Sequence, residues 1–270
     1  MRSYSLAYLT AHTLTPPQAL CAAAQLGYSH IGVRLRPSVT GGDFQDLIGD
    51  APLMRETQAV LRDAGVGVRD LEVVRIGEGF DLESYRPMLE AGAALQARSL
   101  LAMGEDPDPQ RLAASLARLC EMAQSCGLTV DVEFLPWTTV RDANSALALL
   151  KSAGMPTNAG VLVDALHVAR STTTPADIAA LPRACLHYAQ ICDGPGSGAF
   201  TVEQIIHTAR FERQLPGEGG IDLRGIFGAL PADLPVSVEV PNHIRMPQLG
   251  ALEWARQALA ATRAVLEPQS

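Results

Sequence analysis

The stretch DPQRLAASLARLCEMAQSCGLTVDVEFL, residues 108–135, holds one complete helix–glycine–strand unit. Asp108 suits the position that caps a helix start, because its carboxylate can accept hydrogen bonds from free backbone N–H groups. Gly127 stands where a helix ends in a left-handed residue. The residues that follow it alternate between the two faces of a strand. The stretch therefore predicts a helix over residues 108–125 and a strand over residues 128–135.

The same unit recurs along the chain. Gly27, Gly65 and Gly154 also follow helical patterns and precede apolar runs. Pro16 and Pro17 stand at a helix start, where a missing N–H costs nothing. Strands are predicted over residues 3–9, 30–35, 67–73, 98–103, 128–135, 159–164, 185–191 and 235–240. Helices are predicted over residues 16–26, 51–64, 82–96, 108–125, 140–153, 175–181, 201–209, 222–229 and 248–266.

Eight such units in 270 residues average about 34 residues each, which fits the repeat of a (β/α)8 barrel. We therefore predict an α/β fold, a single (β/α)8 TIM barrel that forms one domain over residues 1–270. An open, doubly wound sheet is the alternative, because the order of strands and helices does not distinguish a closed sheet from an open one. The sequence contains neither GxGxxG after its first strand nor GxxxxGK[ST], which argues against nucleotide binding through those motifs.

The composition limits the partners of the protein. The 47% of hydrophobic residues excludes a disordered chain, and the net charge of −8 argues against a nucleic-acid partner. No apolar run approaches the ~20 residues of a membrane span, and the first residues lack the apolar core of a secretory signal. The five cysteines, an odd number without a CxxC pair, favour reduced thiols in a cytoplasmic protein. The sequence leaves a homo-oligomer open.

Four successive predicted strands carry a carboxylate or amide side chain near their C-terminal ends: Glu133, Asp164, Gln190 and Glu239. Alternation places each one opposite its apolar neighbours, so we expect all four to point into the mouth of the barrel. Three carboxylates in one volume repel one another unless a cation lies between them. An all-oxygen set suits Mg²⁺ or Mn²⁺, with Co²⁺ and Zn²⁺ as alternatives. The other interpretation is that each residue is a buried polar group bonded to neighbouring backbone.

Histidines follow several of these strands. His167 comes three residues after Asp164, so we expect it to face the same cleft and to act as a general acid or base, since histidine titrates near neutral pH. A surface or capping role is the alternative. His187 lies on the other face of its strand and is expected to be structural. His12 and His243 follow the first and last strands, and only this position places them near the mouth.

Arginines gather in the loops at the same end of the predicted barrel. Arg210 and Arg213 precede the glycine-rich segment PGEGG, which suits binding of a phosphate or carboxylate but also fits a plain turn with solvated arginines. Arg34, Arg36 and Arg75 follow predicted strand ends. In an acidic protein this grouping predicts a small anionic substrate.

The segments VEFLPW, VDALH, AQICD, RFERQLPGEGGIDL and VSVEVPN resemble the xylose isomerase-like TIM-barrel superfamily, which includes sugar isomerases, epimerases, dehydratases and the endonuclease IV enzymes. The resemblance spans nearly the whole chain and implies a metal set at Glu133, Asp164, Gln190 and Glu239. Within the superfamily the chain is most similar to the 3-dehydroshikimate dehydratase group. That likeness depends on Gln190, on the Asp164–His167 spacing, on Trp137 and on the arginine-preceded PGEG loop.

The resemblance implies a divalent-metal-dependent enzyme that removes a proton α to a carbonyl of a small polyhydroxylated keto substrate. It makes His167, or one of the metal-site residues Glu133 and Glu239, the base. It also implies that Arg210 or Arg213 lies near a substrate carboxylate and that Trp137 contacts substrate. Elimination of a β-hydroxyl would make the enzyme a dehydratase, which is our first prediction. Reprotonation would make it a sugar or sugar-acid isomerase or epimerase, and a non-catalytic barrel is the remaining alternative.

Overall fold

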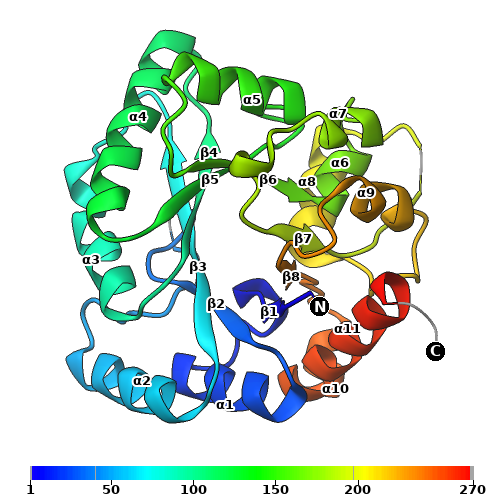
Figure 1. The fold of residues 1–270 in the computed structure, drawn as a ribbon. Helices are drawn as coiled ribbons and strands as arrows, with labels where there is room; N and C mark the ends of the chain where they lie inside the picture. Colours follow the sequence, from blue (N-terminus) through cyan, green and yellow to red (C-terminus); the bar gives the residue numbers. More distant parts are fainter. Residues whose placement is uncertain (1, 40, 197, 268–270) are drawn as a thin grey trace.

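The computed structural model describes residues 2–39, 41–196 and 198–267. Its strands form a closed parallel barrel in sequence order (Figure 1). β1 pairs with β2 on one side and with β8 on the other, which closes the barrel. This closure confirms the TIM barrel and excludes the open sheet. The strands are β1 Tyr4–Leu6, β2 His30–Arg34, β3 Gly67–Ile76, β4 Ser99–Gly104, β5 Thr129–Glu133, β6 Ala159–Asp164, β7 Ala189–Ile191 and β8 Val236–Val238.

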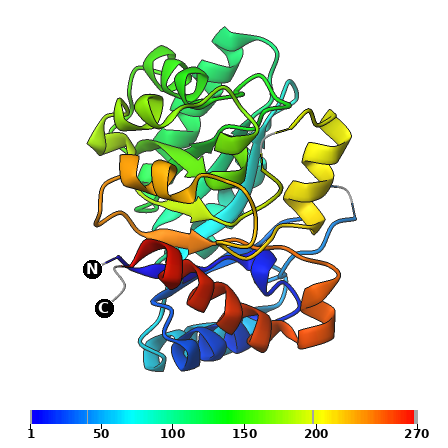
Figure 2. The ribbon, with the colours of Figure 1, turned by 90° about the vertical axis from the view of Figure 1, so that its right-hand side faces the viewer.

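Helices surround the barrel (Figure 1). The α-helices are α1 Pro16–Leu26, α2 Ala51–Asp63, α3 Arg86–Ala94, α4 Pro109–Ser125, α5 Ala143–Ser152, α6 Ala165–Ala169, α7 Pro175–Ala179, α8 Val202–Phe211, α9 Leu223–Ala229, α10 Arg245–Leu249 and α11 Ala251–Leu266. Short 3-10 helices cover Tyr8–Thr10, Glu83–Tyr85 and Arg183–Cys185. Figure 2 shows α8 on the opposite side of the barrel from the two termini. Among the described helices, none is both long and apolar enough to cross a membrane.

The helix–glycine–strand unit forms as the sequence predicts. The side chain of Asp108 accepts hydrogen bonds from the backbone N–H groups of Gln110 and Arg111 at the start of α4. Gly127, which follows α4, has a φ of 74°, a left-handed conformation that glycine adopts without steric cost. The chain then enters β5, which delivers Glu133 at its end.

Apolar side chains are buried in two separate groups. The larger group fills the space between the strands and the surrounding helices. A smaller cluster of Val73, Leu101, Leu162 and Tyr188 packs with Met103. Met103 and Leu162 are the register partners of Glu133 on the two neighbouring strands, so this cluster lies on the same face as Glu133, inside the barrel.

The structure corrects several predicted boundaries. β1 stops at Leu6 rather than at residue 9, because the chain turns there into the first 3-10 helix. β7 begins at Ala189 rather than at residue 185, because Arg183–Cys185 form another such helix. β3 continues to Ile76, three residues beyond its predicted end. The short helices α6 and α10 were not predicted, since five residues are too few to show helical periodicity.

Candidate active site

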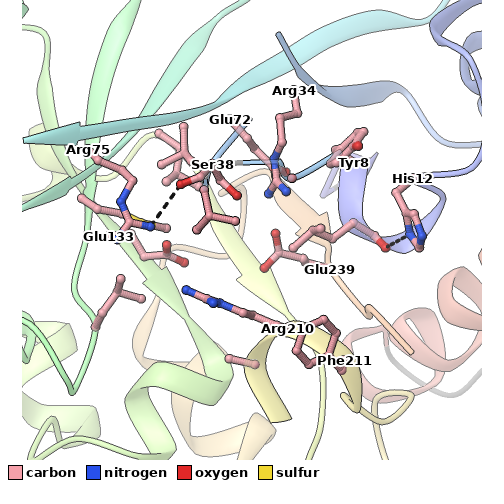
Figure 3. Close-up of a pocket in the computed structure, with 18 of the residues that line it drawn as sticks. Tyr8, His12, Arg34, Ser38, Glu72, Arg75, Glu133, Arg210, Phe211 and Glu239 are labelled. Atoms are coloured by element: carbon pink, nitrogen blue, oxygen red, sulfur yellow. Dashed lines mark hydrogen bonds and ion pairs between the residues drawn. The ribbon is translucent and has the colours of Figure 1, made fainter. Parts of the chain in front are cut away.

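A cavity of about 330 Å³ opens at the C-terminal ends of the strands (Figure 3). Predicted site residues from both halves of the chain line it: Arg34, Arg75, Glu133, Trp137, His167, Arg210, Arg213 and Glu239. The C-terminal face is where TIM-barrel enzymes place their active sites. The cavity is therefore the candidate active site.

Glu133 and His167, which line this cavity, come together with Asp164, which does not line it. One donor atom from each lies within 4.8 Å of the others, and all three residues are buried. The Nε2 atom of His167 lies 3.5 Å from Oε1 of Glu133. Oδ1 of Asp164 accepts hydrogen bonds from the backbone N–H groups of Leu166 and His167, at 2.8 and 3.1 Å. Asp164 thus caps α6, and this cap holds His167 beside the two carboxylates.

Gln190 and Glu239 extend the cluster from the neighbouring strands. Nε2 of Gln190 donates a hydrogen bond of 3.1 Å to Oε1 of Glu239. Oε1 of Gln190 is buried, and in the described part of the chain it has no hydrogen-bond partner. A buried amide oxygen left without a donor is available to bind a cation.

Arg213 occupies the centre of the carboxylate cluster. Its side chain is 3% exposed. Nη1 donates a hydrogen bond of 2.6 Å to Asp164, Nη2 lies 3.0 Å from Glu239, and Nε donates to the carbonyl of Ala209 at 2.9 Å. We expected Arg213 or Arg210 to lie near a substrate carboxylate. Arg213 lines the cavity, and its guanidinium is engaged by carboxylates of the protein itself.

The negative charge that the carboxylates of this cluster can carry exceeds the positive charge of Arg213. Burial, followed by the charges of Glu239 and Asp164, raises the pKa of Glu133 well above its usual range. Burial also raises the pKa of Glu239 to about 8, against the lowering effect of Arg213. At Asp164 burial is the largest influence and acts in the same direction, but the charges of Arg213 and His167 and the hydrogen bonds from both residues together outweigh it, so the net pKa is lowered. A further cation would therefore be stabilised at this cluster.

The donor set fits a hard divalent metal ion. It offers carboxylate oxygens from three strands and the unpaired amide oxygen of Gln190, which are the ligands that Mg²⁺ and Mn²⁺ prefer. The nearby imidazole of His167 also suits Zn²⁺ or Co²⁺.

His167 is held as a neutral imidazole. Burial lowers the pKa of His167 to about 4, although Asp164 acts to raise it. Among the described residues Nδ1 has no hydrogen-bond partner. The Trp137 ring meets the imidazole edge to face, with ring centroids 5.3 Å apart. Trp137, which we expected to contact substrate, thus lines the cavity and also packs against His167.

The remaining predicted arginines differ in how they are paired. Arg34 lies 2.6 Å from Glu72 and stacks over the ring of Tyr8. Arg75 makes two hydrogen bonds to Glu105, at 3.0 and 2.5 Å. Arg36 stacks over Tyr85 and does not line the cavity.

Arg210 stands apart from these paired arginines. Within the described residues it forms no ion pair or side-chain hydrogen bond, in contrast to Arg34, Arg75 and Arg213. Figure 3 shows its side chain extending from α8 into the cavity toward Glu133 and Glu239. Its guanidinium is therefore available to an anionic ligand.

Sequence reasoning missed one acidic residue of the cavity. Glu72 lines the cavity from β3; it fell within the predicted strand, residues 67–73, but was not predicted to belong to the site. The alternation of Asp70 and Glu72 with apolar residues is a signal that would have placed both inside the barrel. His12 and His243, which we expected near the mouth from their position alone, do line the cavity. Their rings stack with centroids 5.2 Å apart, and Phe211 packs edge-on against His243.

Solved structures share this fold across nearly the whole chain. A "xylose isomerase-like TIM barrel/4-hydroxyphenylpyruvate dioxygenase fusion protein" has 22% identity and a TM-score of 0.80, with the match covering 96% of this chain and 42% of that longer one. The IOLI protein "with a binding zinc atom" has 18% identity and a TM-score of 0.80, with 98% of each chain covered. The "probable 3-DHS dehydratase AsbF" from Bacillus anthracis has 15% identity and a TM-score of 0.74, covering 96% of this chain and 98% of that one. At these identities the likeness establishes the fold.

Sequence comparison gives the family. Among curated proteins, none matches the sequence. A family model, however, matches residues 21–265, and its description is "Xylose isomerase-like TIM barrel". Because that match covers most of the chain, the protein belongs to the xylose isomerase-like TIM barrel family.

Proposed function

We propose that the protein is a divalent-metal-dependent enzyme that removes a proton α to a carbonyl of a small, anionic, polyhydroxylated keto substrate. One observation carries the proposal: donor atoms of Glu133, Asp164 and His167 lie within 4.8 Å of one another, and Glu133 and His167 line the cavity. Glu133, Asp164, Gln190 and Glu239 would hold the metal. When bound, the metal supplies positive charge that stabilises negative charge developing on a substrate oxygen.

His167 is the proposed base. Its Nε2 lies 3.5 Å from Oε1 of Glu133, and its Nδ1 has no hydrogen-bond partner among the described residues. A neutral imidazole with a free nitrogen can accept a proton from carbon, and the lowered pKa of His167 favours that neutral form. Trp137 fixes the orientation of the ring through its edge-to-face contact.

Arg210 is the proposed receptor for the anionic group of the substrate. It lines the cavity, and within the described chain it lacks the carboxylate partner that the other cavity arginines have. A guanidinium binds a carboxylate through two parallel hydrogen bonds, which would orient the substrate relative to His167.

The best single candidate is a 3-dehydroshikimate dehydratase-like lyase. After proton removal by His167, loss of the β-hydroxyl would complete the elimination. The similarity to a probable 3-DHS dehydratase and the free Arg210 support this choice. A sugar or sugar-acid isomerase or epimerase is the second candidate, because it shares the first proton transfer and needs the same residues.

The deciding experiment supplies 3-dehydroshikimate with Mn²⁺ or Mg²⁺ and follows the ultraviolet absorbance of the aromatic product. We expect metal-dependent turnover that is abolished in Glu133→Gln and in Glu239→Gln. Glu253→Gln, which changes an exposed glutamate of α11, is the matched control and should keep full activity. Activity on a keto-sugar without any on 3-dehydroshikimate would favour the epimerase. Wild-type rates in both active-site variants would refute the proposal.

A further inference from the structure

One side of the active-site cavity is apolar. Leu101 and Met103 line it from β4, Val73 lines it from β3, and Leu135 lines it from the segment after β5. Val73, Leu101 and Met103 also belong to one packed cluster inside the barrel. We call these four residues the apolar wall. Within the described residues β4 contributes no other side chain to the cavity, so this side presents hydrocarbon and thioether to a ligand.

The apolar wall adjoins the reacting groups of the proposed function. Met103 is the register partner of Glu133, so the two side chains lie next to each other on neighbouring strands. Leu135 follows Glu133 by two residues, and Trp137, two residues further on, packs against His167. A substrate held between the metal ligands and His167 therefore has one side against this wall.

The backbone and the charged residue beside the wall are already hydrogen-bonded. β4 pairs with β5 over Ser99–Met103 and with β3 on its other side, so its N–H and C=O groups serve the sheet. Arg75 is the register partner of Met103 on β3, but its guanidinium donates two hydrogen bonds to Glu105 and one to the carbonyl of Ser38. A ligand hydroxyl at this wall would therefore lose water and gain few hydrogen bonds in return.

Charged side chains line the cavity from other elements. Arg34 lines it from β2, Glu72 from β3, Glu239 from the residue after β8 and Arg210 from the end of α8. Such groups bind hydroxyl groups and anionic groups through hydrogen bonds. The cavity thus has a polar side and an apolar side, and it fits a ligand divided in the same way.

We propose that the substrate presents a hydroxyl-free stretch of carbon to the apolar wall, and that Leu101 and Met103 determine this specificity. The inference rests on the proposed function, since it takes the metal ligands and His167 as the reacting end of the site. An apolar pocket disfavours a ligand with one added hydroxyl by about 100-fold, because that hydroxyl is buried without a partner. An open-chain keto-sugar carries oxygen on every carbon, whereas the ring of 3-dehydroshikimate contains CH and CH2 groups. The wall therefore favours the ring compound.

Calorimetric titration of the full chain in Mn²⁺ with shikimate and with gluconate tests the inference without turnover. Both probes carry one carboxylate and several hydroxyls, but only shikimate has a hydroxyl-free ring edge. We expect shikimate to bind at least about tenfold more tightly than gluconate. Equal or tighter binding of gluconate, or no binding of shikimate at millimolar concentration, would overturn the inference.

Substitutions in the wall separate its specificity from a structural role. Met103→Gln keeps a side chain of similar length and adds an amide, so it should reduce the preference for shikimate at least about threefold. Met103→Leu is the matched control, because it stays apolar and should keep the preference. If Met103→Gln does not fold, Val73→Thr supplies a hydroxyl in nearly the same shape. A preference that is unchanged in the polar variant, or lost equally in Met103→Leu, would contradict the inference.

This result is distinguishable from that of the proposed function. A protein that prefers shikimate but does not convert 3-dehydroshikimate would refute the dehydratase and support the role of the apolar wall. Turnover of 3-dehydroshikimate together with equal binding of the two probes would support the dehydratase and refute that role.

Discussion

Arg213 and Asp164 form a buried ion pair at the centre of the active-site mouth, with Nη1 of Arg213 2.6 Å from Oδ2 of Asp164. The two side chains are 3% and 0% exposed. Arg213 comes from the segment after α8 and Asp164 from the end of β6, so the pair ties a late loop to the barrel. Because Arg213 also lies beside Glu239, one guanidinium neutralises part of the charge that a metal ion would otherwise balance alone.

Removal of Arg213 should destabilise the metal-free protein strongly. Arg213→Ala leaves the buried carboxylates of Asp164 and Glu239 without their cation, and breaking a buried pair in this way costs about 3–5 kcal/mol. Urea denaturation of the metal-free variant measures this loss. Arg245→Ala is the control, since it breaks the more exposed pair with Glu218 and should cost about 0–1 kcal/mol. Equal losses in the two variants would contradict the central role of Arg213.

Metal binding should stabilise the folded protein. A ligand present at 100 times its Kd adds about 2.7 kcal/mol to the free energy of unfolding. We therefore expect Mn²⁺ to raise the melting temperature of the wild type, and a chelator to reverse the rise. Glu133→Gln should lose most of this effect, whereas Glu253→Gln on the surface of α11 should retain it. A wild-type protein that is indifferent to Mn²⁺ and Mg²⁺ would argue against the metal site.

Arg210 should affect substrate binding more than chemistry. Once a substrate is identified, Arg210→Ala should raise KM at least about tenfold with a smaller change in kcat, because the guanidinium binds a group remote from the reacting carbon. Arg224→Ala, at an exposed position of α9, is the control. A variant with unchanged KM would remove Arg210 from the binding site.

The fold followed from the sequence because its signals are local. The cap at Asp108 and the left-handed Gly127 mark one unit, and the same marks recur around the barrel. The closure of the barrel could not be predicted from these local signals, since the pairing of β1 with β8 joins residues more than 200 positions apart. The five-residue helix α6 was not predicted either, because its capping residue Asp164 is the only signal for it in the sequence.

The candidate site was predictable where the side-chain direction follows from strand alternation. Glu133, Asp164, Gln190 and Glu239 each stand at a strand end, and the closed barrel places these ends around one mouth. The partners of the arginines were not predictable, because Arg213 and Asp164 are 49 residues apart and meet only through the chain's path after α8. Which arginine remains free for a ligand is therefore a property of the folded chain.

His187 should make stability depend on pH. Burial lowers the pKa of His187, but the hydrogen bond and charge of Asp131, 2.7 Å away, together raise it by more, so the pKa in the folded state lies above the ordinary histidine value of 6.5. The folded state therefore holds the proton more tightly, and the contribution of the pair is fully present below pH 6.5. This contribution to stability is lost as the pH rises through the pKa of His187 in the folded state.

Comparison of the wild type with His187→Gln by denaturation at a series of pH values tests this direction. The stability difference should be about 1.5–3 kcal/mol at low pH, the range for a hydrogen bond to a charged group, and should shrink as the pH rises. His207→Gln, which removes an exposed pair with Glu212, should show little difference at any pH. A difference that grows with pH would contradict the assignment.

Gly160 of β6 makes room for this His187–Asp131 pair. A Cβ atom at residue 160 would collide with Oδ1 of Asp131 and would lie 2.6 Å from Nδ1 of His187 and 2.9 Å from the carbonyl of Cys185. Gly160→Ala should therefore force the two side chains apart and lower the free energy of unfolding by about 1–3 kcal/mol. The substitution should also reduce the pH dependence of the free energy of unfolding that His187 causes.

Gly228→Ala in α9 is the matched control, because a Cβ atom there meets no described atom within 4 Å and helical alanine is favoured by about 1 kcal/mol. If Gly160→Ala is as stable as Gly228→Ala and keeps the pH dependence, the glycine is not what permits the pair.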